Sequence, residues 1–368
     1  MLTKMRTKHT PSILIVYTGG TIGMRENHVT HALEAFDWSH LESSVPELSQ
    51  FGFNIDAITL GEPIDSSDME PHDWVRMAEA IEENYDRYDG FVLLHGTDTM
   101  AFTASALSFM LENLDKPVII TGSQLPIGQL RTDGKENLLT SIEIAAARTV
   151  KGQPMVPEVC IFFENELLRG NRTTKINAEG FNAFRSYNCP PLAKAGIHID
   201  YARDRILYPA DRSENVRRNL FHTMYGSKHE GLYVHKNLDS HIAILTLFPG
   251  ITEEVVDAVF STPGLRGVIL QTFGSGNAPQ KPWFIKRLKD LRERGIAMVN
   301  ITQCHYGTVD MGRYETSLQL LEAGVINGYD STLECVVTKL MFLLGANYTP
   351  EQLLLLMNTS IAGEITLK

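Results

Sequence analysis

The chain has 368 residues, of which 43% are hydrophobic and 21% are charged, and its formal net charge is −11. A globular chain of this length has room for two hydrophobic cores, so we expect two domains. The acidic balance disfavours a nucleic-acid-binding face, and no apolar run approaches the roughly 20 residues that a membrane-spanning helix needs.

The N-terminus and the cysteines favour a soluble protein of the cytoplasm. The first eight residues are basic like the start of a signal peptide, but the apolar stretch after them has only about five residues, against roughly 7–15 in a signal. The four cysteines lie far apart without Cys-x-x-Cys spacing. In a large chain without an export signal we expect them to be free thiols.

In the first half of the chain, apolar runs of strand length alternate with helical patterns. This alternation is typical of a largely parallel sheet covered by helices. Strands are expected at 13–17, 54–60, 91–95, 117–121 and 158–163. Helical spacing of apolar residues predicts helices over Trp74–Tyr85, with Pro71 near the start, over Ala104–Leu114, and ending over Ile142–Ala147.

A polar stretch without clear periodicity, Tyr201–Asp239, follows, and we interpret it as a linker with an insertion. Beyond it the alternation resumes. The expected elements are strands at 242–247, 267–272 and 296–302 and helices near 252–260, 282–294 and 332–344, the last stopped by Gly345. The predicted organisation is an N-terminal domain over 1–208, a linker over 209–237 and a smaller C-terminal α/β domain over 238–368.

Two loops that follow predicted strands carry hydroxyl groups. The run 13–17 leads into Thr18-Gly19-Gly20-Thr21-Ile22-Gly23, and the run 91–95 leads into Gly96-Thr97-Asp98-Thr99-Met100. Ligands of open α/β sheets bind at the carboxyl ends of the strands, so both loops can face one small ligand. Two more polar segments, Asp65–Asp68 and Gly170–Lys175, are expected on the same side of the sheet, after the strands at 54–60 and 158–163.

Simpler interpretations of these loops stay open. The first is equally consistent with a tight turn and a capping hydroxyl, and Asp98 or Thr99 can cap the helix that follows. A glycine loop at this position also suits phosphate, but the P-loop and dinucleotide patterns are absent after the first strand. Gly274-Ser275-Gly276 begins the dinucleotide pattern, and Pro279 stands where its third glycine belongs.

A threonine nucleophile needs activation, because its hydroxyl holds its proton too tightly at neutral pH. A lysine can accept that proton if its pKa is lowered, and a carboxylate or hydroxyl can hold it in place. Thr97, Asp98 and Lys175 suit such a relay for Thr21, with backbone N–H groups of the glycine turn stabilising an oxyanion. By residue type alone, a surface lysine is the commoner interpretation of Lys175.

Thr18–Gly23 together with His95–Met100 resembles the paired signature of the bacterial-type L-asparaginase family. Asp65–Met69, Leu168–Lys175 and Gly274–Pro279 are similar to its cytoplasmic type I branch, and the resemblance covers nearly the whole chain outside 201–239. It implies hydrolysis of L-asparagine to L-aspartate and ammonia without a metal or organic cofactor. It also implies a larger N-terminal and a smaller C-terminal domain, with sites at an intimate dimer interface, usually within a tetramer.

The resemblance implies roles for individual residues. Thr21 would attack the amide carbonyl of the substrate to form an acyl-enzyme, and the Thr97–Lys175–Asp98 group would activate the nucleophile or the water. Tyr314 matches a tyrosine of type I relatives and on that resemblance would orient Thr21, and a structural tyrosine is nearly as good an interpretation. The implied substrate-binding residues are Gly20, Asp65, Ser66, Ser67, Gly96 and Asp98.

A regulatory site is implied as well, because some type I enzymes bind a second asparagine as an activator. The matching positions here are Thr174, Gln271 and Cys304, with Gln271 in place of an arginine.

Two other functions remain open from the sequence. An asparaginase-like subunit of a tRNA-dependent amidotransferase shares these motifs, but it usually carries an extra N-terminal region. A non-catalytic nucleotide-binding protein would use Gly19-Gly20-Thr21 on a phosphate, and it would not need Thr97, Asp98 and Lys175.

Overall fold

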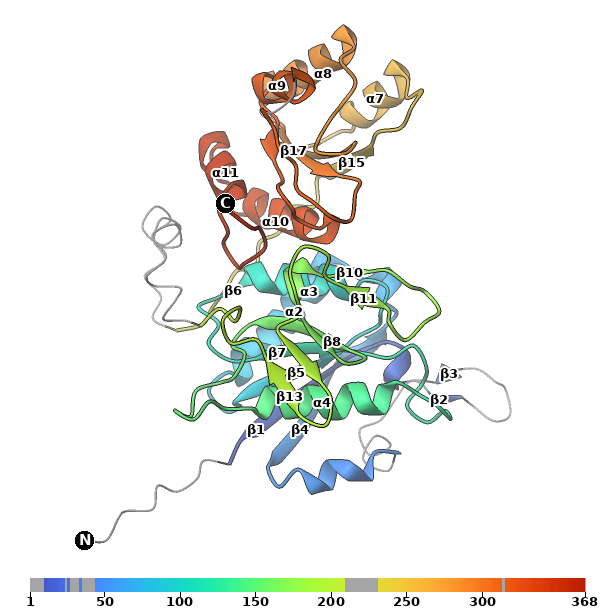
Figure 1. Cartoon of the computed structure of the whole chain (residues 1–368), viewed down its shortest axis with the longest axis vertical. Helices are drawn as coiled ribbons and strands as arrows, with labels where there is room; N and C mark the ends of the chain where they lie inside the picture. Colours follow the sequence, from blue (N-terminus) through green and yellow to red (C-terminus); the bar gives the residue numbers. More distant parts are fainter. Residues whose placement is uncertain are drawn as a thin grey trace, which may run out of the picture.

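The computed structural model describes residues 10–23, 25–26, 33–34, 44–208, 231–312 and 315–367. They form a larger N-terminal and a smaller C-terminal α/β domain, stacked along the long axis of the molecule (Figure 1). Among these residues, the larger domain is built on an eight-stranded sheet of order β13-β12-β9-β8-β7-β5-β1-β4 and the smaller on a four-stranded sheet of order β15-β16-β17-β18. The predicted fold class is therefore confirmed.

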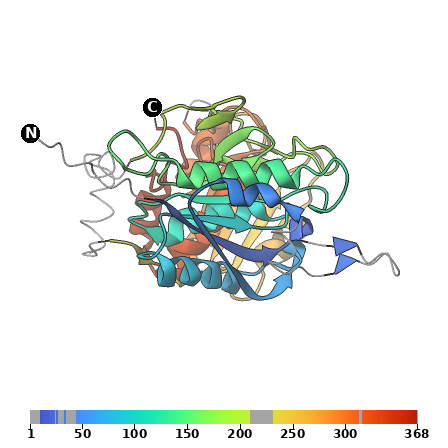
Figure 2. The ribbon, with the colours of Figure 1, turned by 90° about the horizontal axis from the view of Figure 1, so that it is seen from below.

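The larger sheet is parallel through its centre and at the edge formed by residues 54–64, and its central strands are buried on both faces. Its parallel strands are β1 (Ser12–Gly19), β4 (Asn54–Ile64), β5 (Gly90–Leu94), β7 (Val118–Thr121) and β8 (Val159–Phe163). Helices α2 (Pro71–Asn84) and α3 (Met100–Met110) pack on one face, and α4 (Gly134–Ala146) packs on the other. Figure 2 shows the sheet between these layers. Because both faces are covered, the central strands are continuous apolar runs, and this made them predictable.

The predicted helix over 104–114 is placed correctly but ends too late. Helix α3 ends at Met110, because Leu111–Glu112 forms a short strand, β6, that pairs with β14 (Tyr233–Val234). Part of the predicted linker is thus a strand of the larger domain. Residues 209–230 lie outside the described residues, so the domain boundaries at 208 and 238 stay a prediction.

The segment that carries Lys175 does not leave the sheet where the sequence indicated. Strand β9 (Glu166–Arg169) follows β8 and runs antiparallel to it, so that Arg169 lies opposite Cys160. The sequence analysis expected 170–175 after the strand at 158–163, and the structure adds a second, antiparallel strand between them, so the chain first turns back across the sheet. Helix η4 (Gly170–Arg172) then packs against α3, and β10 (Thr174–Lys175) pairs with β11 (Phe184–Arg185).

The antiparallel edge of the larger sheet was not predicted. It consists of β9, β12 (Ala193–Ala195) and β13 (Ile199–Tyr201). These strands are too short for a strong apolar pattern, so their pairing depends on neighbours distant in the sequence.

The smaller domain follows the predicted alternation. Its parallel strands are β15 (Ile242–Thr246), β16 (Gly267–Thr272), β17 (Ala297–Thr302) and β18 (Ile326–Asn327). One face packs against α7 (Glu253–Phe260), α8 (Pro282–Glu293) and α9 (Glu315–Glu322), and the other against α10 (Leu333–Gly345) and α11 (Pro350–Met357). Only β18, α9 and α11 lack a counterpart in the prediction.

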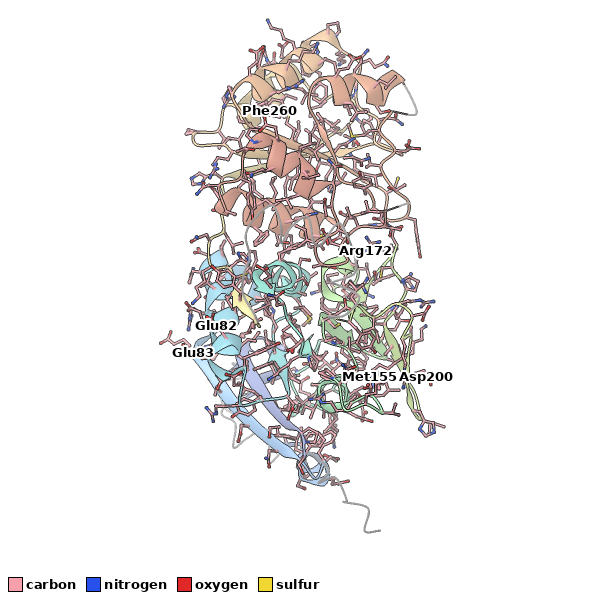
Figure 3. The ribbon with its side chains drawn as sticks, turned by 90° about the vertical axis from the view of Figure 1, so that its left-hand side faces the viewer. Glu82, Glu83, Met155, Arg172, Asp200 and Phe260 are labelled. Atoms are coloured by element: carbon pink, nitrogen blue, oxygen red, sulfur yellow. The ribbon has the colours of Figure 1, made fainter. Side chains whose placement is uncertain are left out.

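The two domains meet where α10 lies on α3, with the rings of Phe109 and Phe342 6.1 Å apart. Arg172 of the larger domain lies at this junction (Figure 3), 2.7 Å from the carboxylate of Asp330. Nearby, Lys339 and Glu364 form a buried ion pair of 2.6 Å that holds the C-terminal tail. No helix in the part of the chain that the structure describes is long and apolar enough to cross a membrane.

Candidate active site

Three loops meet at the carboxyl ends of β1, β5 and β4. Gly20 has a φ of +85°, and a Cβ atom there would lie 2.4 Å from the backbone N of Gly96. A Cβ on Gly96 would in turn lie 2.4 Å from the Ser66 hydroxyl. The close approach therefore requires glycine at both positions. Thr21, which is half-buried, begins the short helix η1 at this junction.

Lys175 joins these loops. Its Nζ donates to Thr97 Oγ1 at 2.8 Å and to Asp98 Oδ1 at 2.7 Å. The lysine side chain is only 18% exposed, so the interpretation as a surface lysine was wrong. Charge-assisted hydrogen bonds of this kind are short and strong, and here they hold an ammonium against a hydroxyl and a carboxylate.

The predicted substrate-binding residues lie beside this group. Buried Ser66 accepts from the Asp98 backbone N–H at 3.3 Å, and its carbonyl accepts from the Thr99 hydroxyl at 2.7 Å. Asp65 accepts two hydrogen bonds of 2.9 Å, from the backbone N–H and the hydroxyl of Ser67, and these lower the pKa of its carboxyl group. The side chains of Asp98 and Thr99 thus serve inter-loop contacts, and the alternative that they merely cap α3 was wrong.

A buried hydrogen-bond chain that the sequence analysis missed supports the second loop. Trp74 Nε1 donates to the Thr103 hydroxyl at 3.0 Å, and that hydroxyl lies 2.8 Å from His95 Nε2. His95 Nδ1 lies 2.7 Å from the carbonyl of Gly96. Since an indole N–H only donates and a carbonyl only accepts, the chain assigns a proton to Nδ1 of a neutral imidazole.

Burial lowers the pKa of His95 to about 4, so the ring stays neutral near pH 7. It holds the Gly96 carbonyl and thereby the start of the loop that carries Thr97. Trp74 and Thr103 look like ordinary helix residues in the sequence, which offered no signal for this role.

Gln124 is a second residue that the sequence analysis missed. The Thr97 hydroxyl donates to its Oε1 at 3.2 Å, and its Nε2 donates to the carbonyl of Gly180 at 3.1 Å. Gln124 comes shortly after the strand at 118–121, so the rule that located the other loops also indicates this one.

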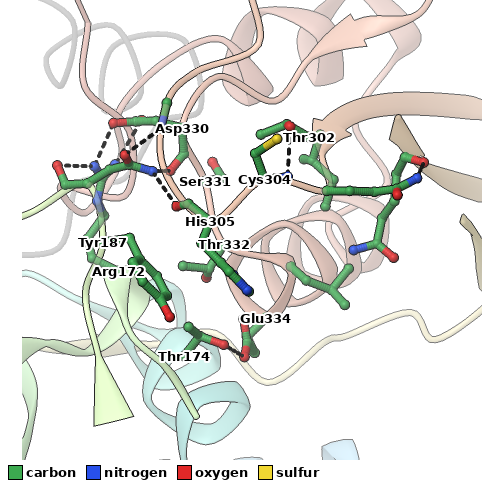
Figure 4. Close-up of a pocket in the computed structure, with 16 residues that line it drawn as sticks. Arg172, Thr174, Tyr187, Thr302, Cys304, His305, Asp330, Ser331, Thr332 and Glu334 are labelled. Carbon is green, nitrogen blue, oxygen red and sulfur yellow. Dashed lines mark hydrogen bonds and ion pairs between the residues drawn. The ribbon is translucent and has the colours of Figure 1, made fainter. Parts of the chain in front are cut away.

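A pocket of about 220 Å³ lies between the domains, apart from the three loops (Figure 4). Thr174, Gln271 and Cys304, the three residues of the predicted regulatory site, all line it. The Thr174 hydroxyl donates to Glu334 at 2.5 Å, and burial raises the pKa of that carboxyl group. Since Thr174 directly precedes Lys175 in β10, one short strand contributes to both the pocket and the threonine–lysine group.

Arg172 and Asp330 form a charged part of the pocket wall, joined by hydrogen bonds of 3.0 and 2.7 Å. Burial alone would raise the pKa of Asp330, but the hydrogen bonds and charge of Arg172 outweigh it and lower the pKa.

Tyr314, the remaining predicted site residue, lies outside the described residues. Within the described ranges, no group of three or more His, Cys, Asp or Glu side chains is placed to hold a metal ion.

Comparisons with known proteins agree with this architecture. Residues 12–207 match the family model described as "Asparaginase, N-terminal", and residues 241–357 match "Glutaminase/Asparaginase C-terminal domain". The chain is 44% identical over 362 residues to L-asparaginase 1 of Escherichia coli, covering 96% of this chain and 98% of that protein. It is 40% identical over 354 residues to the 60 kDa lysophospholipase of Mus musculus, covering 90% of this chain but only 58% of that protein.

A solved structure is also similar. The crystal structure of L-asparaginase I from Vibrio cholerae superposes with a TM-score of 0.84 at 42% sequence identity, covering 98% of this chain and 100% of that one.

Proposed function

The chain belongs to the asparaginase family, and from this premise we propose that it hydrolyses L-asparagine to L-aspartate and ammonia. The observation that carries the proposal is Lys175 Nζ bonded to both Thr97 and Asp98, beside the loop of Thr21. A hydroxyl, an amine and a carboxylate in contact can move a proton at a reacting centre, as amide hydrolysis requires.

In the proposed reaction, Thr21 Oγ forms a bond to the side-chain carbonyl carbon of asparagine. The C–N bond then breaks, and ammonia leaves with the proton that the nucleophile gave up. Water attacks the resulting ester and gives a proton to the Thr97–Lys175 pair; the bond between the acyl carbon and Thr21 Oγ then breaks, and that proton is returned to Thr21 Oγ. Backbone N–H groups of the glycine turn at 19–21 would stabilise the oxyanion at each step.

Recognition of the free amino acid is assigned to the loops around this centre. Asp98 is 61% exposed and one of its oxygens contacts Lys175, which leaves the other oxygen to accept from a substrate ammonium group. Asp65, Ser66 and Ser67 would bind the rest of the amino-acid end, and Gly20 and Gly96 would line the site with backbone. Charged hydrogen bonds of this kind distinguish asparagine from a bare amide.

The test is ammonia release by the purified protein from L-asparagine and, separately, from L-glutamine. Lys175→Met should lower kcat by about 10²–10⁴-fold, because it removes the proton carrier. Lys194→Met is the matched control, since that lysine is 66% exposed and forms an ion pair with Glu166 on the antiparallel edge of the sheet. No ammonia from asparagine, or equal losses in the two variants, would contradict the proposal.

The same assay separates the alternatives. Thermal stabilisation by ATP without ammonia release would indicate a nucleotide-binding protein. Ammonia passed from glutamine to a charged tRNA would indicate an amidotransferase subunit. Release of fatty acid from a lysophospholipid is measured alongside, because a relative carries that name.

We also propose that a second asparagine binds as an activator in the pocket of Thr174, Gln271 and Cys304. Support comes from β10, where Thr174 lines the pocket and the next residue, Lys175, contacts Thr97. The rate against asparagine concentration should then be sigmoidal, and Thr174→Val should make it hyperbolic. A hyperbola for the wild-type protein would remove this part of the proposal.

The family resemblance further leads us to propose a homo-oligomer, a dimer or dimer of dimers, in the cytoplasm, without nucleic acid as a partner. Tyr314 would orient Thr21 in that assembly. Sedimentation velocity on the full chain tests the oligomeric state, and Tyr314→Phe tests the role of the phenol.

A further inference from the structure

Gln124 is held rigidly against the loop that carries Thr97. Its backbone N–H donates to both oxygens of Asp133, at 3.1 and 3.0 Å, and the next N–H, of Leu125, donates to Asp133 at 3.2 Å. Asp133 is the N-cap residue of α4, so a helix end fixes this backbone. On its other side, a Cβ at Gly122 would lie only 2.3 Å from the carbonyl of His95.

The hydrogen-bond partners of Gln124 decide which way its side-chain amide faces and where the Thr97 hydroxyl proton points. The carbonyl of Gly180 can only accept, so the amide nitrogen of Gln124 faces it and the amide oxygen faces Thr97. That oxygen also only accepts, so the Thr97 hydroxyl proton points to Gln124. Lys175 Nζ therefore donates to a lone pair of Thr97.

From this network we infer that Gln124 is a positioning residue that sets the direction of the Thr97 hydroxyl. A hydroxyl oxygen has one proton and two lone pairs. The proton of the Thr97 hydroxyl points to Gln124, and one of its lone pairs accepts from Lys175. The second lone pair is therefore left to accept a hydrogen bond from the reacting water or the substrate amide. Without Gln124 the hydroxyl can rotate, and its proton then points toward the water or the amide that the second lone pair would otherwise hold by a hydrogen bond.

Two substitutions at this position separate the roles of its two ends. Gln124→Met keeps the length of the side chain but removes both hydrogen bonds. Gln124→Glu keeps an acceptor for Thr97 but loses the donor to Gly180. We expect Gln124→Met to lower kcat on asparagine by about tenfold, the equivalent of one hydrogen bond, with KM within about twofold of wild type.

Gln124→Glu should recover most of the kcat when each variant is compared at the plateau of its pH profile. Its carboxylate can accept from the same Thr97 hydroxyl as the amide oxygen of Gln124, so the direction of that proton is kept. Gln153→Met, at an exposed turn, is the matched control and should keep wild-type kcat.

This inference rests on the proposed function, and the two fail in different ways. A wild-type protein that releases no ammonia from asparagine contradicts the proposed function. An active wild-type protein whose Gln124→Met variant keeps kcat within about twofold contradicts only the inference. So does a Gln124→Glu variant that loses as much kcat as Gln124→Met, because the contact with Gly180 would then be the important one.

Discussion

The contact between Gly20 and Gly96 provides a stringent test of the site geometry. In Gly20→Ala, the added Cβ would lie 2.4 Å from the N and 2.5 Å from the Cα of Gly96. Carbon atoms without a bond between them lie about 3.5–4.0 Å apart. The two loops must therefore separate by about 1 Å, and both are made of backbone, so no side chain can rotate away.

The substitution has two separate costs. An alanine at a φ of +85° is strained, which lowers the free energy of unfolding by about 1–2 kcal/mol. The separation of the loops moves the Thr97 loop relative to Thr21, and a shift of about 1 Å between reacting groups lowers the rate by about 100-fold. We therefore expect kcat to fall by about two orders of magnitude in a protein that still folds.

Gly295→Ala is the matched control. Gly295 has a φ of +74° in the turn after α8, and no heavy atom lies within 4 Å of the position of its Cβ. It should lose a similar amount of stability in urea unfolding and none of the ammonia release from asparagine. Wild-type kcat in Gly20→Ala, or an equal loss of kcat in Gly295→Ala, would refute the geometric argument.

Three further predictions concern the nucleophile, the buried histidine and the buried ion pair. Thr21→Val and Thr97→Val should each abolish ammonia release while leaving the circular dichroism spectrum and the Tm unchanged, and near-normal turnover in either would defeat the mechanism. His95 has a folded-state pKa of about 4 against 6.5 when unfolded, so only the unfolded chain gains this proton as the pH falls from 6.5 to 4. Between pH 6.5 and pH 4 the free energy of unfolding of the wild-type protein should therefore fall by roughly 3 kcal/mol more than that of His95→Asn. An equal fall in both proteins, measured by urea unfolding, would contradict this. Lys339→Met leaves the carboxylate of Glu364 buried without its ion pair and should cost about 3–5 kcal/mol of unfolding free energy. The double variant with Glu364→Gln should cost less, and equal losses would show that the pair is not coupled.

The elements that the sequence predicted well share a local cause. A strand buried on both faces is a continuous apolar run, and an amphipathic helix repeats its apolar residues along one face. The strands at 13–17, 91–95 and 267–272 were therefore located almost to the residue. The short strands β6, β9 and β14 were missed, because each is held by a partner elsewhere in the chain.

The candidate site likewise contains residues that the sequence predicted and residues that it did not. The loops of Thr21, Ser66 and Thr97 follow parallel strands, so their convergence at one sheet edge was predictable from strand order alone. Lys175 was proposed from residue chemistry and from resemblance, and the route of the chain to it was predicted only in part, because β9 turns the chain back before η4 packs against α3. Gln124 belongs to no motif, and His95 belongs to the His95–Met100 signature without a role assigned to it; their hydrogen bonds reveal what both do.

The amino-acid sequence by itself determined the sheet, its helices and the chemical groups that end its parallel strands, because each depends on a pattern within a few neighbouring residues. Tertiary structure alone decided that Lys175 is held by Thr97 and Asp98, that Gln124 directs a hydroxyl proton, and that Thr174 lines a pocket with Gln271 and Cys304. Thr97 and Gln124 are 27 positions apart, and Thr97 and Lys175 are 78 positions apart. The order of residues along a chain does not specify the distances between such distant parts.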